Sequence, residues 1–224
     1  MIRWDDYWAQ YSISPAEQWL IEQRDEILSK YIDSIKSRKK RVIEIGCGFG
    51  SNIRLINSKY DNVETHALDF SSKAIEIISE EIGNTYVADC RDTKLPDNHF
   101  DIVYSAGLLE HFRNERPIVR EFRRIIKKGG YVITFVPAKY SLWQVYQAMH
   151  LGNWIHGYEK AYSTDALKYI MESEGLGTIE ITGIDPFSIP GFIIKLTGRK
   201  LDFPLGYSPV KSGYTEICIV SKKT

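Results

Sequence analysis

The chain has few cysteines and no excess of either charge. Its three cysteines, Cys47, Cys90 and Cys218, lie far apart in the sequence, so neither a CxxC metal pair nor a disulfide framework is expected. Lysine plus arginine equals aspartate plus glutamate, 29 of each. A net charge near zero gives no reason to expect a nucleic-acid partner.

Long apolar runs are also missing. No stretch approaches the ~18 apolar residues that a membrane span requires. The N-terminal residues MIRWDDYWAQ lack the apolar core of a signal peptide. No HExxH motif or cluster of acids suggests a metal. These absences predict a cytoplasmic protein with no integral membrane contact and no metal site.

Apolar periodicity predicts one domain over residues 1–224, built from alternating strands and helices. Strands are expected at 41–45, 62–70, 84–89, 100–106, 130–137, 178–184 and 214–222. Helices are expected at 15–35, 51–60, 71–82, 114–128 and 163–175, with 114–128 closed by Gly129 and Gly130. Alternation through five strands predicts a parallel sheet covered by helices on both faces, and the last two strands should pair antiparallel.

The stretch VIEIGCGFG, residues 42–50, places three glycines between a buried strand and a helix. Glycines at the carboxyl edge of an open α/β sheet let the backbone approach a nucleotide-type ligand. A dinucleotide fingerprint would need a third glycine at position 51, which is Ser51. The chain has no Gly-Lys pair for a phosphate-binding P-loop, and the glycine loop has no lysine or arginine. These features favour a ligand without phosphates.

Two acids follow the next two strands of the predicted sheet. Asp69 can accept hydrogen bonds from ribose hydroxyls, and Asp89 can meet an adenine edge. Together with the glycine loop, they describe a cleft for an adenosine with a small zwitterionic tail. Simpler interpretations remain. One is that the glycines serve only a tight turn, and another is that Asp69 caps the next helix. A third is that Arg91 or Asp92, rather than Asp89, is the functional residue of its polar loop.

Four ordered segments then resemble class I S-adenosylmethionine-dependent methyltransferases, in particular the small-molecule group related to quinone-biosynthesis enzymes. They are VIEIGCGFG, ALDFS, VADCRDTKLPDNHFDIVYSAGLLEHF and EFRRIIKKGGYVITFVP. The resemblance covers about residues 40–180. It implies an α/β, Rossmann-like, doubly wound sheet of seven strands, mostly parallel with an antiparallel last strand.

The resemblance also implies which residues contact S-adenosyl-L-methionine. The loop that wraps its methionine part comprises Glu44, Gly46, Cys47, Gly48 and Gly50. The other implied contacts are Asp69 on the ribose, Phe70 on the adenine, Asp89 and Cys90 at the adenine amine, and Ser105 and Ala106 beside the methionine. The segment WDDYW, residues 4–8 in an N-terminal helical cap 1–38, resembles an aromatic cover over the cofactor.

His111, in GLLEHF, is the candidate catalytic residue. It follows the fourth strand at the cleft, where a neutral imidazole can take a proton from the acceptor. The alternative, weighed equally, is that Glu110 and His111 merely form the turn before the next helix. Positioning alone can supply up to ~7–11 kcal/mol, so the chemistry does not require an obvious base.

Two segments outside the shared core are expected on the acceptor side. Residues 137–162 combine an amphipathic helix with many aromatic residues, which indicates either a lid over an apolar or aromatic acceptor or a completion of the core. Residues 184–213 form a long connection with four prolines. Within it, 191–201 mixes apolar and basic residues. A peripheral membrane contact is one interpretation, and a surface extension or dimer contact is the favoured one.

The sequence therefore predicts an enzyme that moves a methyl group to oxygen or carbon of a small apolar or aromatic acceptor, with nitrogen left open. The protein is expected to be a monomer or homodimer with no nucleic-acid partner. Two alternatives from other classes are a nicotinamide-dependent oxidoreductase and a non-catalytic regulatory protein that binds S-adenosylmethionine.

Overall fold

A computed structural model describes residues 4–9, 11, 13, 15–139, 141, 158–184 and 215–223. The strands are β1 Lys40–Ile45, β2 Val63–Asp69, β3 Asn84–Val87, β4 Phe100–Ala106, β5 Ile126–Pro137, β6 Leu176–Ile184 and β7 Glu216–Lys223. The helices are α1 Trp4–Trp8, α2 Pro15–Ser34, α3 Ser51–Lys59, α4 Ser72–Ile78, η1 Leu109–His111 (a short 3₁₀ helix), α5 Arg116–Ile125 and α7 Thr164–Ser173.

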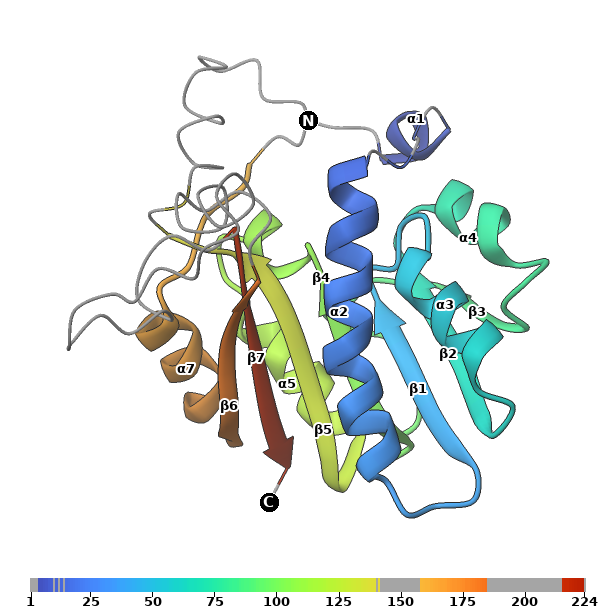
Figure 1. Cartoon of the computed structure of the whole chain (residues 1–224). Helices are drawn as coiled ribbons and strands as arrows, with labels where there is room; N and C mark the ends of the chain where they lie inside the picture. Colours follow the sequence, from blue (N-terminus) through green and yellow to red (C-terminus); the bar gives the residue numbers. More distant parts are fainter. Residues whose placement is uncertain are drawn as a thin grey trace, which may run out of the picture.

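The strands form one seven-stranded sheet in the order β3-β2-β1-β4-β5-β7-β6 (Figure 1). β1 pairs in parallel with both β2 and β4, β2 with β3, and β4 with β5. β7 lies antiparallel between β5 and β6. This arrangement confirms the predicted fold class. The strand order reverses between β1 and β4, which is where open α/β sheets bind ligands.

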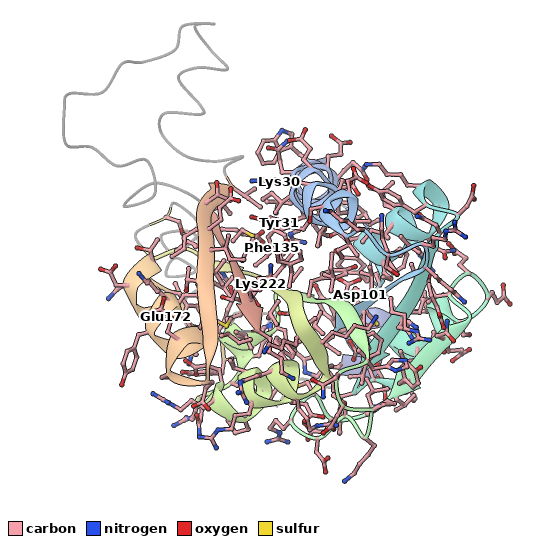
Figure 2. The ribbon with its side chains drawn as sticks, turned by 90° about the horizontal axis from the view of Figure 1, so that it is seen from below. Lys30, Tyr31, Asp101, Phe135, Glu172 and Lys222 are labelled. Atoms are coloured by element: carbon pink, nitrogen blue, oxygen red, sulfur yellow. The ribbon has the colours of Figure 1, made fainter. Side chains whose placement is uncertain are left out.

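Helices cover both faces of the sheet because alternate residues of its central strands are apolar on both sides. On one face, Leu28 and Ile32 of α2 pack with Val42 and Phe135, and all four are fully buried. The helices α3 and α4 complete this layer. The helices α5 and α7 cover the opposite face. Figure 2 shows the two layers from below, with Tyr31 of α2 and Glu172 of α7 on opposite sides of the sheet.

The boundary between α5 and β5 differs from the predicted one. The helix ends at Ile125, and the strand begins at once with Ile126, which pairs with Phe100. The two glycines that were expected to close the helix lie inside β5. A side chain at Gly130 would come within 2.9 Å of the Asp101 carbonyl oxygen. The register of the β4–β5 pair shifts here, so the glycines accommodate a close strand approach rather than a helix end.

Several predictions fall on residues outside the described ranges. These are the amphipathic helix expected within 142–149 and the contact expected for 191–201. Within the described ranges, no helix is long and apolar enough to cross a membrane. No group of three or more metal-ligating side chains occurs among these same residues.

Candidate active site

The glycine loop leaves β1 with three glycines in the left-handed region, at φ values of +71°, +49° and +70° for Gly46, Gly48 and Gly50. A Cβ added at Gly46 would lie 2.7 Å from Leu108 Cδ1, and one at Gly48 would lie 2.4 Å from Trp8 Cη2. Other residues would therefore be strained and would also clash at both positions. The loop presents bare backbone beneath two apolar side chains.

Asp69, at the end of β2, holds this loop against the start of α4. Its Oδ2 accepts a hydrogen bond from the Gly48 N–H at 2.8 Å, and its Oδ1 accepts one from the Ser71 N–H at 2.8 Å. Burial raises the pKa of Asp69, and these hydrogen bonds oppose that shift. Ser71 itself caps α4, because its Oγ accepts from the Ala74 N–H, so Asp69 is not the helix cap. Each carboxylate oxygen can accept a further bond.

Glu44 finds a partner inside the protein. The strand register sets it beside Tyr104 on β4, and the Tyr104 hydroxyl donates to Glu44 Oε2 at 2.9 Å. Glu44 is 4% exposed, and this burial raises its pKa to about 8. The sequence analysis assigned Glu44 only to the loop around the methionine part of the cofactor. It did not identify Tyr104, because the pairing depends on register.

The region after β2 and β3 combines exposed apolar side chains with an ion pair. Phe70 is 72% exposed and Val87 is 57% exposed at the ends of β2 and β3, a surface suited to an aromatic ring. Asp89 pairs with Arg91, with Nη2 and Oδ2 2.6 Å apart, and the hydrogen bond from Arg91 lowers the pKa of Asp89. Cys90 is buried. The carboxylate of Asp89 is thus engaged within its own loop.

The end of β4 leads directly to the candidate base. Ser105 is fully buried and its Oγ has no hydrogen-bond partner within the described part of the chain; Ala106 is half-buried. His111 Nδ1 lies 3.0 Å from the Tyr158 carbonyl oxygen. A carbonyl can only accept, so this contact assigns the proton to Nδ1 and leaves the Nε2 lone pair free. Burial lowers the pKa of His111, which favours this neutral form.

A clamp formed by residues 158–162 fixes η1 and therefore His111. The Tyr162 hydroxyl donates to the Leu109 carbonyl oxygen at 3.0 Å, and the Lys160 N–H donates to the Glu110 carbonyl oxygen at 3.1 Å. Lys160 also pairs with Glu115, with Nζ and Oε2 2.6 Å apart. These contacts join residues about 50 positions apart in the sequence, so sequence periodicity could not reveal them.

The helix α1 brings the aromatic segment 4–8 onto the same edge of the sheet. Trp8 lies against Gly48, and the ring of Trp4 meets the ring of His111 edge-on, with centroids 5.1 Å apart. Asp5 accepts from the Ser71 hydroxyl and from the Lys73 N–H. Figure 1 shows α1 beside α4 at this edge. The segment thus contacts the glycine loop, the start of α4 and the candidate base.

Arg24 and Glu110 are two further residues of this region that the sequence analysis did not place in the site. Arg24 of α2 is bound by Glu216 of β7, with Nε and Oε2 3.0 Å apart. Glu110 is 3% exposed. In the sequence, Arg24 belongs to a polar helix face and Glu110 to a turn. Nothing in the local pattern marks either side chain as buried.

Comparison with known proteins agrees with this geometry. Residues 43–134 match the family model described as a methyltransferase domain. Phosphoethanolamine N-methyltransferase 3 of Arabidopsis thaliana is 29% identical over 115 residues, which cover 48% of this chain and 23% of the plant protein. Demethylmenaquinone methyltransferase of Thermotoga maritima is 30% identical over 96 residues, 42% of each chain. The matched segments thus span less than half of either relative.

Solved structures extend the likeness to nearly the whole chain. A crystal structure of an S-adenosylmethionine-dependent methyltransferase from Archaeoglobus fulgidus superimposes with a TM-score of 0.67 and 20% identity, covering 91% of this chain and 94% of that one. At 20% sequence identity, this similarity shows a shared fold and nothing about the reaction. Residues 43–134 are therefore similar to a methyltransferase domain, and the whole fold is that of a solved S-adenosylmethionine-dependent methyltransferase.

Proposed function

We propose that this protein is an S-adenosylmethionine-dependent methyltransferase that acts on a small-molecule acceptor. The observation that carries the proposal is the Asp69 carboxylate, which joins the bare glycine loop at Gly48 to the start of α4. The acceptor lies at the carboxyl end of β2, next to β1, and the strand order reverses between β1 and β4. The matching family model supports the same function.

The residues present fit this cofactor. Residues 44–50 contain no lysine or arginine, which suits a ligand without phosphates, and a Cβ at Gly46 or Gly48 would clash with Leu108 or Trp8. The loop would hold the methionine part with Ser105 and Ala106, Asp69 the ribose, and Phe70, Asp89 and Cys90 the adenine. The cofactor supplies a methyl group already activated by its sulfonium.

The protein then has to place the acceptor, exclude water and hold a proton where the acceptor releases one. His111 Nε2 is suited to the last task because Nδ1 is engaged by the Tyr158 carbonyl. Trp4 and Trp8 of α1 cover this edge of the sheet with apolar surface. We assign water exclusion to this helix.

The target atom belongs to the proposal as well. The matched proteins include N-, O- and C-methyltransferases, so the comparisons support a methyltransferase without selecting an atom. We retain oxygen or carbon of a small apolar or aromatic acceptor, as the aromatic residues in 137–162 suggest. A screen of phenols, quinones, lipids and amines for methyl transfer tests this choice. Binding of nicotinamide cofactors in a fluorescence titration would instead favour the oxidoreductase, and cofactor binding with no acceptor would favour the regulatory protein.

Replacing Asp69 with alanine is expected to weaken S-adenosylmethionine binding about 10- to 150-fold. The substitution removes the acceptor proposed for the ribose and releases the Gly48 N–H, and hydrogen bonds to charged groups contribute roughly 1.5–3 kcal/mol. Isothermal titration calorimetry measures the change. Asp61→Ala, at an exposed turn before β2, serves as the control. Equal affinity of Asp69→Ala and wild type would refute the assignment of Asp69.

A further inference from the structure

Glu110 is a buried carboxyl without a partner for one of its oxygens. It belongs to η1, is 3% exposed, and its Oε2 has no hydrogen-bond partner within the described part of the chain. Its Oε1 lies 3.5 Å from the position of a Cβ on Gly107. An unpaired buried oxygen costs roughly 1–3 kcal/mol. A buried carboxyl of this kind is stabilised either by a bound ligand or by its own protonation.

The charged groups that act on Glu110 include one cation, and a carboxylate already binds that cation. These groups are Arg24 from α2, Glu216 from β7 and Glu159 from the clamp. Arg24 is bound through its guanidinium by Glu216, so its charge is already balanced. Burial raises the pKa of Glu110 well above its ordinary value, and the two neighbouring glutamates add to this shift. Both effects favour the protonated form of Glu110 when the site holds no cation.

The chain neighbours of Glu110 belong to two parts of the candidate active site. Leu108, two residues earlier, touches Gly46 of the glycine loop. His111, the next residue, is the candidate base. The charges of both Glu44 and Glu110 act to raise the pKa of Arg24. Glu110 thus lies in the chain between a residue that contacts the glycine loop and the candidate base, with its carboxyl beside Gly107.

We propose that Glu110 is the counter-charge of the cofactor sulfonium and gives up its proton to solvent when that cation binds. The proposal rests on the function proposed above. A positive charge placed beside a buried carboxyl favours its ionised form. The demethylated product, S-adenosylhomocysteine, has a neutral thioether in place of the sulfonium. Glu110 therefore keeps its proton when the product is bound.

Through Glu110, the site should bind S-adenosylmethionine and S-adenosylhomocysteine with affinities whose ratio depends on pH. Binding that releases a proton strengthens as pH rises, as long as the pH is below the pKa of the group in the free protein. Affinity for S-adenosylmethionine should increase with pH, whereas the contribution of Glu110 to product affinity should stay flat. During turnover, loss of the sulfonium charge lets Glu110 take back one proton, which matches the one that the acceptor releases.

Calorimetry with the two ligands tests the proposal without any acceptor. S-adenosylmethionine and S-adenosylhomocysteine are titrated at pH 7 in phosphate and in Tris, whose different ionisation enthalpies reveal the number of protons released. The wild-type protein is expected to release up to about one proton more with S-adenosylmethionine. In Glu110→Gln this difference should disappear, and affinity for S-adenosylmethionine should fall about tenfold while that for the product stays within about twofold.

Two variants separate Glu110 from other groups. Glu76→Gln, on the exposed face of α4, should behave as wild type. Glu44→Gln should retain the difference in proton release between the two ligands; if that variant loses it and Glu110→Gln does not, the assignment to Glu110 is wrong. The assignment is also wrong if Glu110→Gln binds both ligands with the affinity and proton release of the wild-type protein, while a thermal unfolding transition shows that the variant is folded. Wild-type protein that binds neither ligand would overturn the proposed function as well.

Discussion

Replacing His111 with asparagine is expected to slow methyl transfer by roughly 10²- to 10⁴-fold, the usual contribution of a general base. Asparagine can place its side-chain N–H where Nδ1 donates to the Tyr158 carbonyl oxygen, 3.0 Å away. It has no counterpart of the Nε2 lone pair. The variant therefore keeps the local hydrogen bond and loses the proton acceptor, whereas His111→Ala loses both.

Initial rates with the acceptor found in the screen provide the measurement, and calorimetry checks that cofactor affinity is unchanged. In the wild-type protein at saturating S-adenosylmethionine, kcat/KM for the acceptor should rise with pH through the pKa of His111, which burial holds below its ordinary value, since only the neutral imidazole accepts a proton. That rise should be missing in His111→Asn. His99→Asn, at the opposite end of β4, is the matched control. Full activity in His111→Asn with loss of activity in His111→Ala would show that His111 only holds the turn.

The free protein is expected to lose up to about 4 kcal/mol of stability through Glu44 between pH 5 and pH 8. The folded-state pKa of Glu44, about 8, lies above the ordinary value of 4.5. In this window the folded state binds a proton that the unfolded state does not. Its stabilising contribution is complete below the unfolded pKa and is lost as pH rises through the folded one, at about 1.4 kcal/mol per pH unit.

Denaturant unfolding at pH 5, 6, 7 and 8 measures this effect. Glu44→Gln retains an oxygen that can accept from the Tyr104 hydroxyl, but it does not titrate, so its stability should depend less on pH. Part of the slope should remain, because burial raises the pKa of Glu110 as well. Glu76→Gln should show the wild-type slope. An equally steep slope in Glu44→Gln would mean that Glu44 is ionised in the folded protein throughout this range.

The arrangement of strands and helices could be predicted because it depends on short-range periodicity. Apolar residues in β1 and β4 mark strands that are buried on both faces. The sequence shows no helical pattern between the last two expected strands, and this predicted their antiparallel pairing. The glycine loop and Asp69 were found at the right edge for the same reason, since parallel strands end together. The start of β5 was missed because the double glycine there serves a close contact with Asp101.

The sequence by itself thus determined the order of elements, the sheet type and the edge at which the candidate site lies. Only the tertiary structure decided which side chains meet there: Tyr104 with Glu44, Gly48 with Asp69, and Tyr158 with His111. It also decided that Glu110 is buried with one oxygen unpaired. The physical reason is that periodicity reports the face on which a residue lies. Partners distant in the chain, and the loss of water around a charge, depend on strand register and on how loops pack over one another.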